Sequence, residues 1–446
     1  MSLPTAKTLV EYATRRRRLM EAIGADDIVI VAGAGETLRN RDVHYRFRQN
    51  SDFWYLTGFT EPDAIAVLAP GHKDGAFVLF VRPRNAEREI WDGRRAGPAG
   101  AVRDYGADQA FEITEFDAVL PGLLSGRARV HCTLGESPEF DARLTACVRH
   151  LREVSRRGGA APGEFIALEN TLHEQRLIKT EAELSLLRHA CSVSAAAHVR
   201  AMRYAAPDRN EYEVMAELEY VFARADMEPG YGSIVGGGDN SCILHYVEND
   251  AVLRDGDLLL IDAGGEYHGY TADITRTFPV NGRYSNAQRE VYELVLTAQL
   301  AAIDQMRPGV DSALPHQATV RVLTEGLVRL GLLQGGVDKL IESETYKRFY
   351  MHGTGHWLGM DVHDVGRYKL DGNSRPFVAG MVMTAEPGLY IAPDSADIDP
   401  RYRGIGIRIE DDVLITAEGN EVLTAGVPKT VDGIEALMAE SRVVAV

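Results

Sequence analysis

Residues 258–280 read LLLIDAGGEYHGYTADITRTFPV, and this stretch decides the fold of the second part of the chain. An apolar run ends at Asp262, a glycine-rich turn follows, and a second strand-like run carries Asp273. This turn chemistry predicts a β-hairpin. If the turn is centred between Tyr267 and His268, Asp262 lies directly opposite Asp273. Because like charges that face each other destabilise a sheet, a bound cation would explain the pair. The alternative is an offset register in which both carboxylates face solvent.

A second segment, MHGTGHWLGMDVHDVG at 351–366, concentrates three histidines: His352, His356 and His363. The glycines between the first two make a helix unfavourable, and the helical H-E-x-x-H zinc motif is absent. A single histidine in such a segment is usually structural. Three of them beside glycines favour a loop that presents imidazoles to a site.

Two further strand-like segments end in charged residues. In MVMTAEPGLY (381–390) an apolar run stops at Glu386, directly before a Pro-Gly turn. In GIGIRIEDDVL (404–414) isoleucines alternate with Arg408 and Glu410, and this period of two places both charges on one face of a strand. The alternatives are a solvated glutamate and a solvent-facing ion pair, which would contribute little to stability.

Taken together, these segments supply four carboxylates and one imidazole. The candidate ligands are Asp262, Asp273, His356, Glu386 and Glu410. Such an oxygen-rich set suits Mn²⁺, Co²⁺, Fe²⁺ or Mg²⁺ better than a thiolate-rich zinc site would. Four negative charges offset two divalent cations, so the residues predict a two-metal centre.

The order of predicted elements divides the chain into two domains. Up to residue 173, helix and strand signals alternate, with a helix expected over 8–23 and buried strands in DDIVIVAGAG, AIAVLAPG and AFVLFVRPR. This pattern is typical of an α/β domain. The Gly/Pro-rich stretch SRRGGAAPG at 155–163 is a candidate linker. The arginine run Arg15 to Arg18 is interpreted as the solvated face of a helix rather than a localisation signal.

From residue 174 to 446 the order helix, helix, strands occurs twice, which predicts one domain built of two similar halves. Thr180 with Glu183 forms a capping box that starts the first helix, and Asn210 caps the second. Helices are also expected over 285–306 and 311–332. The glycine-rich stretch 232–240 matches no phosphate-binding pattern and is interpreted as a turn or close-approach loop.

Composition limits the possible partners and compartments. The chain has 446 residues and a formal net charge of −17, which argues against a nucleic-acid or anionic-membrane surface. No apolar run reaches the length of a membrane span, and the first residues lack a signal peptide's apolar core. The four cysteines form no C-x-x-C pair, so we expect free thiols and a cytoplasmic enzyme.

Several of these segments also resemble a known family. Residues 261–280, 352–366, 384–390 and 404–414 are similar, nearly residue for residue, to the aminopeptidase P group of the pita-bread metallopeptidases. The aromatic FRQNSDFWYLTGF and the segment IWDGRRAG resemble the N-terminal domain of that group. The resemblance implies a creatinase-like α/β domain followed by a pita-bread catalytic domain with a pseudo-twofold repeat.

The resemblance assigns a role to each candidate ligand. Asp262 would bind one metal, His356 and Glu386 the other, and Asp273 and Glu410 would bridge both. Glu386 would also carry the proton, and a hydroxide between the metals would attack the peptide carbonyl.

The resemblance also implies a set of residues that contact the peptide. The expected substrate-binding residues are His245, His352, His363, Tyr390, Arg408 and Trp91. Among them, His245 and His363 would stabilise the tetrahedral intermediate and so count as catalytic. Tyr390, Arg408 and His352 would shape a pocket for proline, while Trp91 would reach the site of a neighbouring subunit.

The implied function is hydrolysis of the N-terminal Xaa-Pro bond of peptides that carry proline at the second position. Two divalent ions are expected per subunit, with manganese first and cobalt, iron or zinc as alternatives, in a homodimer or homotetramer. Prolidase, which cleaves Xaa-Pro dipeptides, would use the same ligands. A creatinase-like enzyme or a binding protein on the same fold is the alternative from another functional class.

Overall fold

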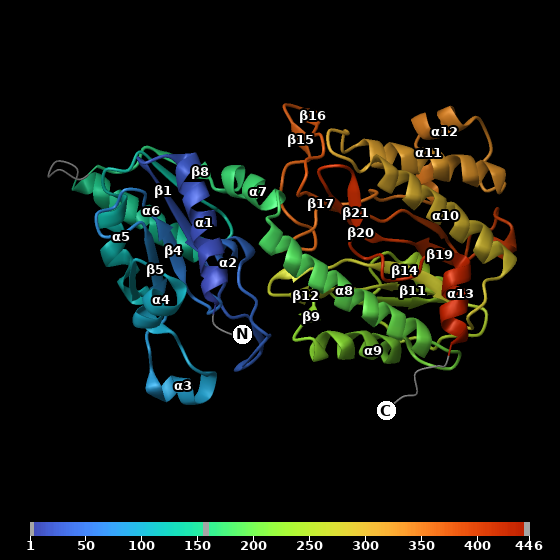
Figure 1. Cartoon of the computed structure of the whole chain (residues 1–446), viewed down its shortest axis with the longest axis horizontal. Coiled ribbons are helices and arrows are strands. Elements are labelled where there is room, and N and C mark those ends of the chain that lie inside the picture. The colour runs from blue at the N-terminus through green and yellow to red at the C-terminus, as the bar shows by residue number, and fades with distance from the viewer. Residues whose placement is uncertain (1–3, 155–159, 441–446) are drawn as a thin grey trace. The chain divides into compact units, whose positions relative to one another are not determined.

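The computed structural model describes residues 4–154 and 160–440 and divides the chain into two compact units, Met1–Gln175 and Arg176–Val446 (Figure 1). The division falls within α7 (Glu169–Leu177). The predicted domain boundary after residue 173 stays a prediction, and residues 155–159 of the expected linker lie outside the described residues. No helix in the described part of the chain combines the length and the apolar character that crossing a membrane requires.

The first unit is built on a six-stranded mixed sheet with the order β6-β5-β4-β1-β7-β8. Antiparallel pairing joins β1 to β4 and β4 to β5, and the other three neighbouring pairs are parallel. The strands are β1 (Asp27–Ala32), β4 (Ile65–Leu68), β5 (Phe77–Val81), β6 (Gln109–Glu112), β7 (Arg129–Cys132) and β8 (Glu164–Ala167). The three strands expected from sequence are present as β1, β4 and β5, so the predicted α/β class is confirmed.

The first unit also contains helices and a separate short hairpin of β2 (Leu38–Asn40) and β3 (Val43–His44). The helices are α1 (Ala6–Ile23), α2 (Ser51–Thr57), α3 (Ala86–Asp92), α4 (Gly97–Tyr105), α5 (Phe116–Leu124) and α6 (Pro138–Glu153). The helix predicted over 8–23 is therefore confirmed as α1.

The expectation that the arginine run of α1 faces solvent is wrong for Arg15 and Arg16. Both are buried, because they lie on the helix face that also buries Leu19. The Arg15 guanidinium lies over the ring of Tyr55, and that of Arg16 over Phe77. Each guanidinium also donates a hydrogen bond to a backbone carbonyl of α2. Cation–π and carbonyl contacts thus replace water for these two charges.

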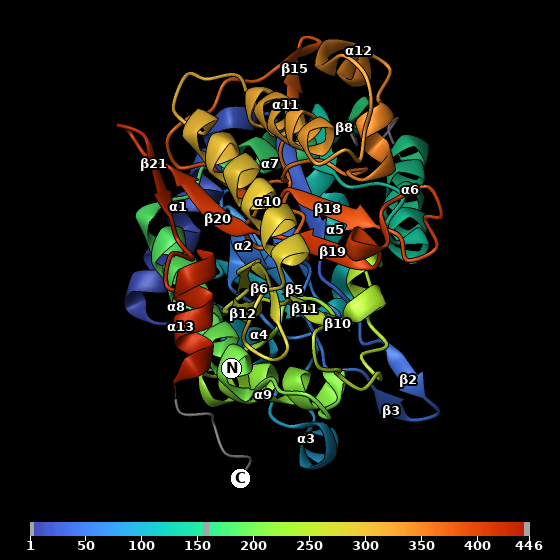
Figure 2. The same cartoon turned by 90° about the vertical axis from the view of Figure 1, so that its right-hand side faces the viewer.

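The second unit repeats one arrangement, as the sequence predicted. In its first half α8 (Glu181–Tyr204) packs against α9 (Glu211–Arg224), and in its second half α10 (Asn286–Gln305) packs against α11 (Leu314–Arg329) (Figures 1 and 2). Strands follow each pair of helices. The remaining helices are α12 (Val337–Glu342) and α13 (Val431–Ala439). The predicted pita-bread architecture of two similar halves is confirmed.

The strands of each half form small sheets. The first half has the orders β10-β11-β14 and β13-β12-β9, and the second half has β17-β20-β21 and β18-β19. First-half strands are β9 (Glu228–Pro229), β10 (Ile234–Gly237), β11 (Leu258–Asp262), β12 (Gly265–Tyr267), β13 (Tyr270–Thr271) and β14 (Thr275–Pro279). Second-half strands are β15 (Lys369–Leu370), β16 (Asn373–Ser374), β17 (Val382–Ala385), β18 (Gly388–Ile391), β19 (Ile405–Arg408), β20 (Asp411–Ile415) and β21 (Asn420–Val422). Because β19 contacts both β11 and β14, the two halves meet at their strands.

Local side-chain chemistry explains where α8 and α9 begin. The Thr180 side chain accepts the backbone N–H of Glu183, whose carboxylate accepts the N–H of Thr180. Asn210 and Glu213 form the same reciprocal pair at the start of α9. The capping box at Thr180 and the cap at Asn210 were both predicted from sequence, and both helix starts are confirmed.

The hairpin that opened the sequence argument has a different register from the one considered there. Asp262 pairs with Thr275, not with Asp273. The turn lies at His268 and Gly269, which both have positive φ, 48° and 83°, as a two-residue type I′ turn requires. The predicted turn centre was one residue too early, and a shift of one residue in the turn changes each cross-strand partner by two.

The glycine-rich stretch 232–240 is also more regular than expected. Its residues Ile234–Gly237 form β10, which pairs with β11. The expected close approach is present, since a Cβ on Gly237 would lie 2.7 Å from the Leu253 side chain. Backbone pairing with β11 explains why a segment with turn-like composition forms a strand.

Candidate active site and metal centre

A pocket of about 480 Å³ in the second unit collects the charged residues that the sequence singled out. It receives side chains from both halves of the unit. All five predicted metal ligands line it, namely Asp262, Asp273, His356, Glu386 and Glu410. The structure thus brings together residues that are up to 148 positions apart, from 262 to 410.

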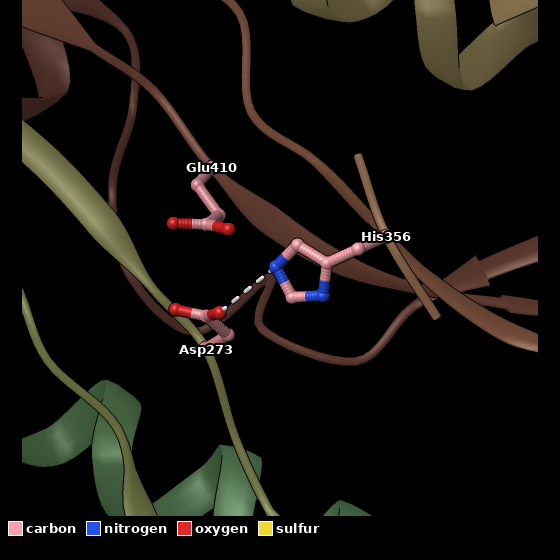
Figure 3. A group of neighbouring side chains, drawn as sticks. All are labelled: Asp273, His356 and Glu410. Carbon is pink, nitrogen blue, oxygen red and sulfur yellow. Dashed lines mark ion pairs between the residues drawn. The ribbon is translucent and has the colours of Figure 1, made fainter. Parts of the chain in front are cut away.

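Asp273, His356 and Glu410 form the tightest group in this pocket (Figure 3). Each offers one ligand atom, and these atoms all lie within 4.8 Å of one another. The His356 Nε2 atom lies 3.4 Å from Asp273 Oδ2. Two oxygen donors and one nitrogen donor converge here, as a divalent cation site requires.

The orientation of His356 suits metal binding. Its Nδ1 atom lies 3.0 Å from the carbonyl oxygen of Trp357, to which it donates a hydrogen bond. This leaves Nε2 directed at the carboxylates, 3.6 Å from Glu386 Oε1. A backbone carbonyl that holds the second ring nitrogen is a common way of fixing a ligating imidazole.

Asp262 and Asp273 are joined by Tyr231, which the sequence reasoning missed. The Tyr231 hydroxyl lies 2.7 Å from Asp262 Oδ1 and 2.5 Å from Asp273 Oδ1. A phenol carries one proton and can donate it to only one carboxylate at a time. The cluster therefore needs a further positive charge, from a proton or a cation. The only sequence signal for this role of Tyr231 was its position between two glycines, shortly before a strand.

Arg408 neutralises part of this charge. It is 3% exposed, and its guanidinium donates to Asp262 at 2.6 Å and to the Tyr390 hydroxyl at 3.0 Å. Glu410 is likewise buried and accepts a hydrogen bond from the Thr275 hydroxyl at 2.6 Å. The alternative of a solvent-facing Arg408–Glu410 pair is excluded, because both groups are buried and Arg408 pairs with Asp262.

The raised pKa values in the site show that positive charge, as protons or cations, stabilises it. Burial raises the pKa of Glu386 to about 7, and burial with the charges of Asp273 and Glu386 raises the pKa of Glu410 well above its usual range. Burial alone would lower the pKa of His356, but its hydrogen bond with Asp273 and the nearby carboxylates raise that pKa to about 9. The donor set therefore fits divalent cations, which would replace these protons.

The histidines expected at the substrate lie in the same pocket. His245, His352 and His363 all line it. His352 Nε2 lies 2.9 Å from the Tyr390 hydroxyl. The rings of His363 and His356 pack edge to face, with their centroids 4.4 Å apart. Burial and the charge of Arg408 lower the pKa of His352 to about 4, so this imidazole is neutral at pH 7.

Apolar residues complete the pocket, and the sequence reasoning did not identify them. They are Ile234, Leu244, Val247 and Val362. Ile234 lies in the glycine-rich segment and Val362 directly before His363 in the histidine-rich segment, but neither segment marked these apolar residues as lining a pocket.

Trp91 lies on α3 of the first unit, where it is 84% exposed. Its expected reach into a neighbouring subunit's site stays a prediction.

Comparison with known proteins identifies the family. Residues 185–417 match the family model described as metallopeptidase family M24, and residues 12–131 match the aminopeptidase P, N-terminal domain. The chain belongs to metallopeptidase family M24. It is 46% identical to an Xaa-Pro aminopeptidase of Escherichia coli, over 97% of this chain and 98% of the relative. An Xaa-Pro aminopeptidase of Haemophilus influenzae is 44% identical over 96% and 97%.

Solved structures give the same result. The aminopeptidase PepP of Pseudomonas aeruginosa matches with a TM-score of 0.96 and 55% identity, covering 97% of this chain and 98% of that one. The zinc-substituted aminopeptidase P of E. coli in complex with product matches with a TM-score of 0.94 and 45% identity, covering 99% and 100%. The predicted family is confirmed, and an M24 metallo-hydrolase with the aminopeptidase P domain is supported over the prolidase alternative.

Proposed function

We propose that this M24 chain is a metallo-aminopeptidase that removes the first residue of peptides in which proline is second. The observation that carries the proposal is the convergence of four carboxylates and one imidazole in a single pocket with His245, His352 and His363. The full-length similarity to Xaa-Pro aminopeptidases supports the same activity.

The proposed ligand roles follow the family pattern. Asp262 would hold one ion, and His356 and Glu386 would hold the second. Asp273 and Glu410 would each contact both ions. Bound there, the two ions would activate a water as the nucleophile and polarise the scissile carbonyl. The clustering of Asp273, His356 and Glu410 supports this assignment.

Glu386 is the proposed proton carrier. Its carboxyl would accept a proton from the attacking water and deliver it to the proline nitrogen as the peptide bond breaks. Without metal its pKa is raised by burial to about 7, so near neutral pH this carboxyl can release its proton when the cations bind.

His245 and His363 are the proposed groups that hydrogen-bond the peptide and stabilise the tetrahedral intermediate. His352, Tyr390 and Arg408 form a connected set, since Tyr390 bonds both other side chains. We propose that this rigid set shapes the proline pocket. Proline amides lack an N–H and have a fixed φ, so a rigid pocket recognises them better than a flexible one would.

We further propose manganese as the working ion, with cobalt, iron or zinc as alternatives, and a homodimer or homotetramer as the assembly. The cysteines Cys132, Cys147, Cys191 and Cys242 are free thiols, which supports a cytoplasmic location.

A chelator and metal add-back series tests the proposed function. The protein is stripped of metal and assayed on an Xaa-Pro-Xaa tripeptide, the matched Xaa-Ala-Xaa tripeptide and the Xaa-Pro dipeptide. We expect no turnover without metal, recovery with Mn²⁺, and cleavage of the Xaa-Pro-Xaa tripeptide far above the alanine control. Activity confined to the dipeptide would instead identify a prolidase, and turnover unaffected by chelation would contradict the two-metal mechanism.

A further inference from the structure

Two consecutive aspartates, Asp411 and Asp412, directly follow the proposed ligand Glu410, and nothing in the proposed mechanism uses them. Both side chains are fully buried. Burying two neighbouring carboxyl groups is costly unless each has a specific set of partners. Their partners turn out to be different.

Asp411 has the contacts of a structural residue. Its carboxylate accepts hydrogen bonds from four side chains, which are Arg276 at 2.6 Å, Lys429 at 2.7 Å, Gln299 at 2.8 Å and Thr424 at 2.8 Å. Two of these donors are cationic, so the charge is fully compensated.

Asp412 has no cationic partner in the described part of the chain, and its Oδ1 atom has no hydrogen-bond partner there. Its Oδ2 atom accepts the backbone N–H of the proposed ligand Asp273 at 3.0 Å and the thiol of Cys191 at 3.3 Å. Asp412 itself is held firmly, because it lies on β20 and pairs with Thr384 on β17.

The bond to Asp273 lies at a break in the strand. The strand pairing of β14 with β11 ends at Thr275 and that of β13 with β12 at Thr271, and one further backbone bond extends each ladder, from Ala263 to Ile274 and from Ala272 to Gly265. Asp273 lies between these two ladders, so no neighbouring strand holds its N–H. The side chain of Asp412, from the other half of the unit, supplies the missing acceptor.

We propose that Asp412 is a positioning residue for the metal centre: its carboxyl oxygen fixes the backbone of Asp273 and thereby aims the Asp273 side chain at the metals. It touches neither substrate nor metal and acts only through Asp273. Outer partners of this kind are often worth 10- to 100-fold in metal affinity. The inference rests on the proposed function, because it concerns one of the proposed ligands.

Replacing the acceptor tests the proposal. Asp412→Leu has nearly the same shape but cannot accept the Asp273 N–H, whereas Asp412→Asn keeps an acceptor oxygen. The affinity of each metal-free protein for Mn²⁺ is measured by isothermal titration calorimetry, and thermal unfolding without metal is recorded in parallel. We expect about 10- to 100-fold weaker binding for Asp412→Leu and binding within about threefold of the unaltered chain for Asp412→Asn.

Cys191→Ala is the matched control, because it removes the other hydrogen bond to Asp412 and leaves the Asp273 bond in place. It should bind Mn²⁺ like the unaltered chain. Unchanged affinity in a folded Asp412→Leu protein would overturn the inference. If the Asp412→Leu protein does not unfold cooperatively, Asp412→Ala is measured in its place. If neither variant folds while Asp412→Asn does, the inference is wrong and Asp412 is a structural residue. If the unaltered chain binds no Mn²⁺, the proposed function fails separately.

Discussion

At the residue scale, the environment of Glu386 explains how one carboxyl group can bind metal and also carry a proton. It follows β17 directly, and its backbone N–H donates to the carbonyl of Thr354, which fixes where the strand ends. The side chain enters the pocket among Asp273, His356 and Arg408, whose charges act on it from several sides. In the metal-free protein burial raises its pKa to about 7, so the carboxyl gives up its proton near neutral pH when the cations bind.

Glu386→Gln removes the titrating group and keeps the shape of the side chain. We expect turnover of an Xaa-Pro-Xaa peptide to fall by at least about a hundredfold, because proton transfer by a positioned group contributes roughly that much or more. Circular dichroism should show an unchanged fold. Glu418→Gln, in an exposed turn, is the matched control and should keep full activity. A Glu386→Gln rate equal to that control would remove the proton-carrying role.

At the element scale, the irregular loop that carries the three histidines is held both by backbone hydrogen bonds to β17, such as that from the Thr384 N–H to the His356 carbonyl, and by buried charges. The carboxylate of Asp364, next to His363, accepts hydrogen bonds from Arg176 at 2.6 Å and from Lys179 at 2.9 Å. Its backbone N–H donates to the carbonyl of Trp357, which closes the loop on itself. Close packing reinforces this, since a Cβ on Gly359 would lie 2.2 Å from the Asp364 carboxylate.

Lys179→Met tests how far these charges hold the loop. Lys179 and Asp364 are both almost fully buried, while Arg176 still faces the carboxylate in the variant. We expect the free energy of unfolding to fall by about 2–3 kcal/mol, less than for a buried charge left alone, and kcat to fall because His363 is adjacent. Urea unfolding and peptide turnover measure the two effects.

Lys347→Met provides the comparison, since Lys347 pairs with Glu344 at the surface. Its effect on the free energy of unfolding should be much smaller than that of Lys179→Met, because an exposed ion pair contributes little. Equal effects of the two lysine substitutions would show that the Asp364 cluster does not hold the loop.

At the scale of the whole molecule, the candidate centre exists only where the two halves of the second unit meet. The first half contributes Asp262 and Asp273, and the second contributes His356, Glu386 and Glu410. The backbone N–H of Glu410 donates to the carbonyl of Thr275 at 3.0 Å, which joins the halves beside the ligands. Part of the net charge of −17 is therefore concentrated in one buried pocket, and this concentration makes stability depend on pH.

The metal-free protein should lose stability as pH rises from about 7 to 9, above the range in which the lowered pKa of His352, about 4, acts in the opposite direction. The raised pKa of Glu386, about 7, gives a stabilising contribution that is complete below its ordinary value of 4.5 and is lost as pH rises through 7. The raised pKa of His356, about 9, gives a contribution complete below 6.5 and lost as pH rises through 9. Both changes have the same sign.

Urea unfolding of chelator-treated protein at pH 7, 8 and 9 measures this trend. With Mn²⁺ bound the loss should be smaller, because the cation neutralises the carboxylates, and Mn²⁺ affinity should increase with pH as the ligands lose their protons. A metal-free stability that stays constant over this range would contradict the account of the buried charges.

Much of this molecule was predictable because the relevant signals are local. The capping box at Thr180 acts over three residues, and the continuous apolar runs of β1, β4 and β5 lie in strands only four to six residues long. The charged residues stand out at the ends of apolar runs. The four carboxylates predicted to share a site therefore do line one pocket. The turn of the hairpin was misplaced by one residue, since several neighbouring positions had compatible turn chemistry.

The sequence by itself determined the family, the two-part organisation, the repeated order of elements and the candidate ligands, because each depends on residue type and short-range spacing. Only the tertiary structure decided that the Arg15 guanidinium lies over the ring of Tyr55, that Tyr231 joins two carboxylates, and that Asp412 reaches the backbone of Asp273. These contacts join residues 31 to 139 positions apart. Their partners are set by how sheets and helices pack, and no local pattern in the chain encodes that packing.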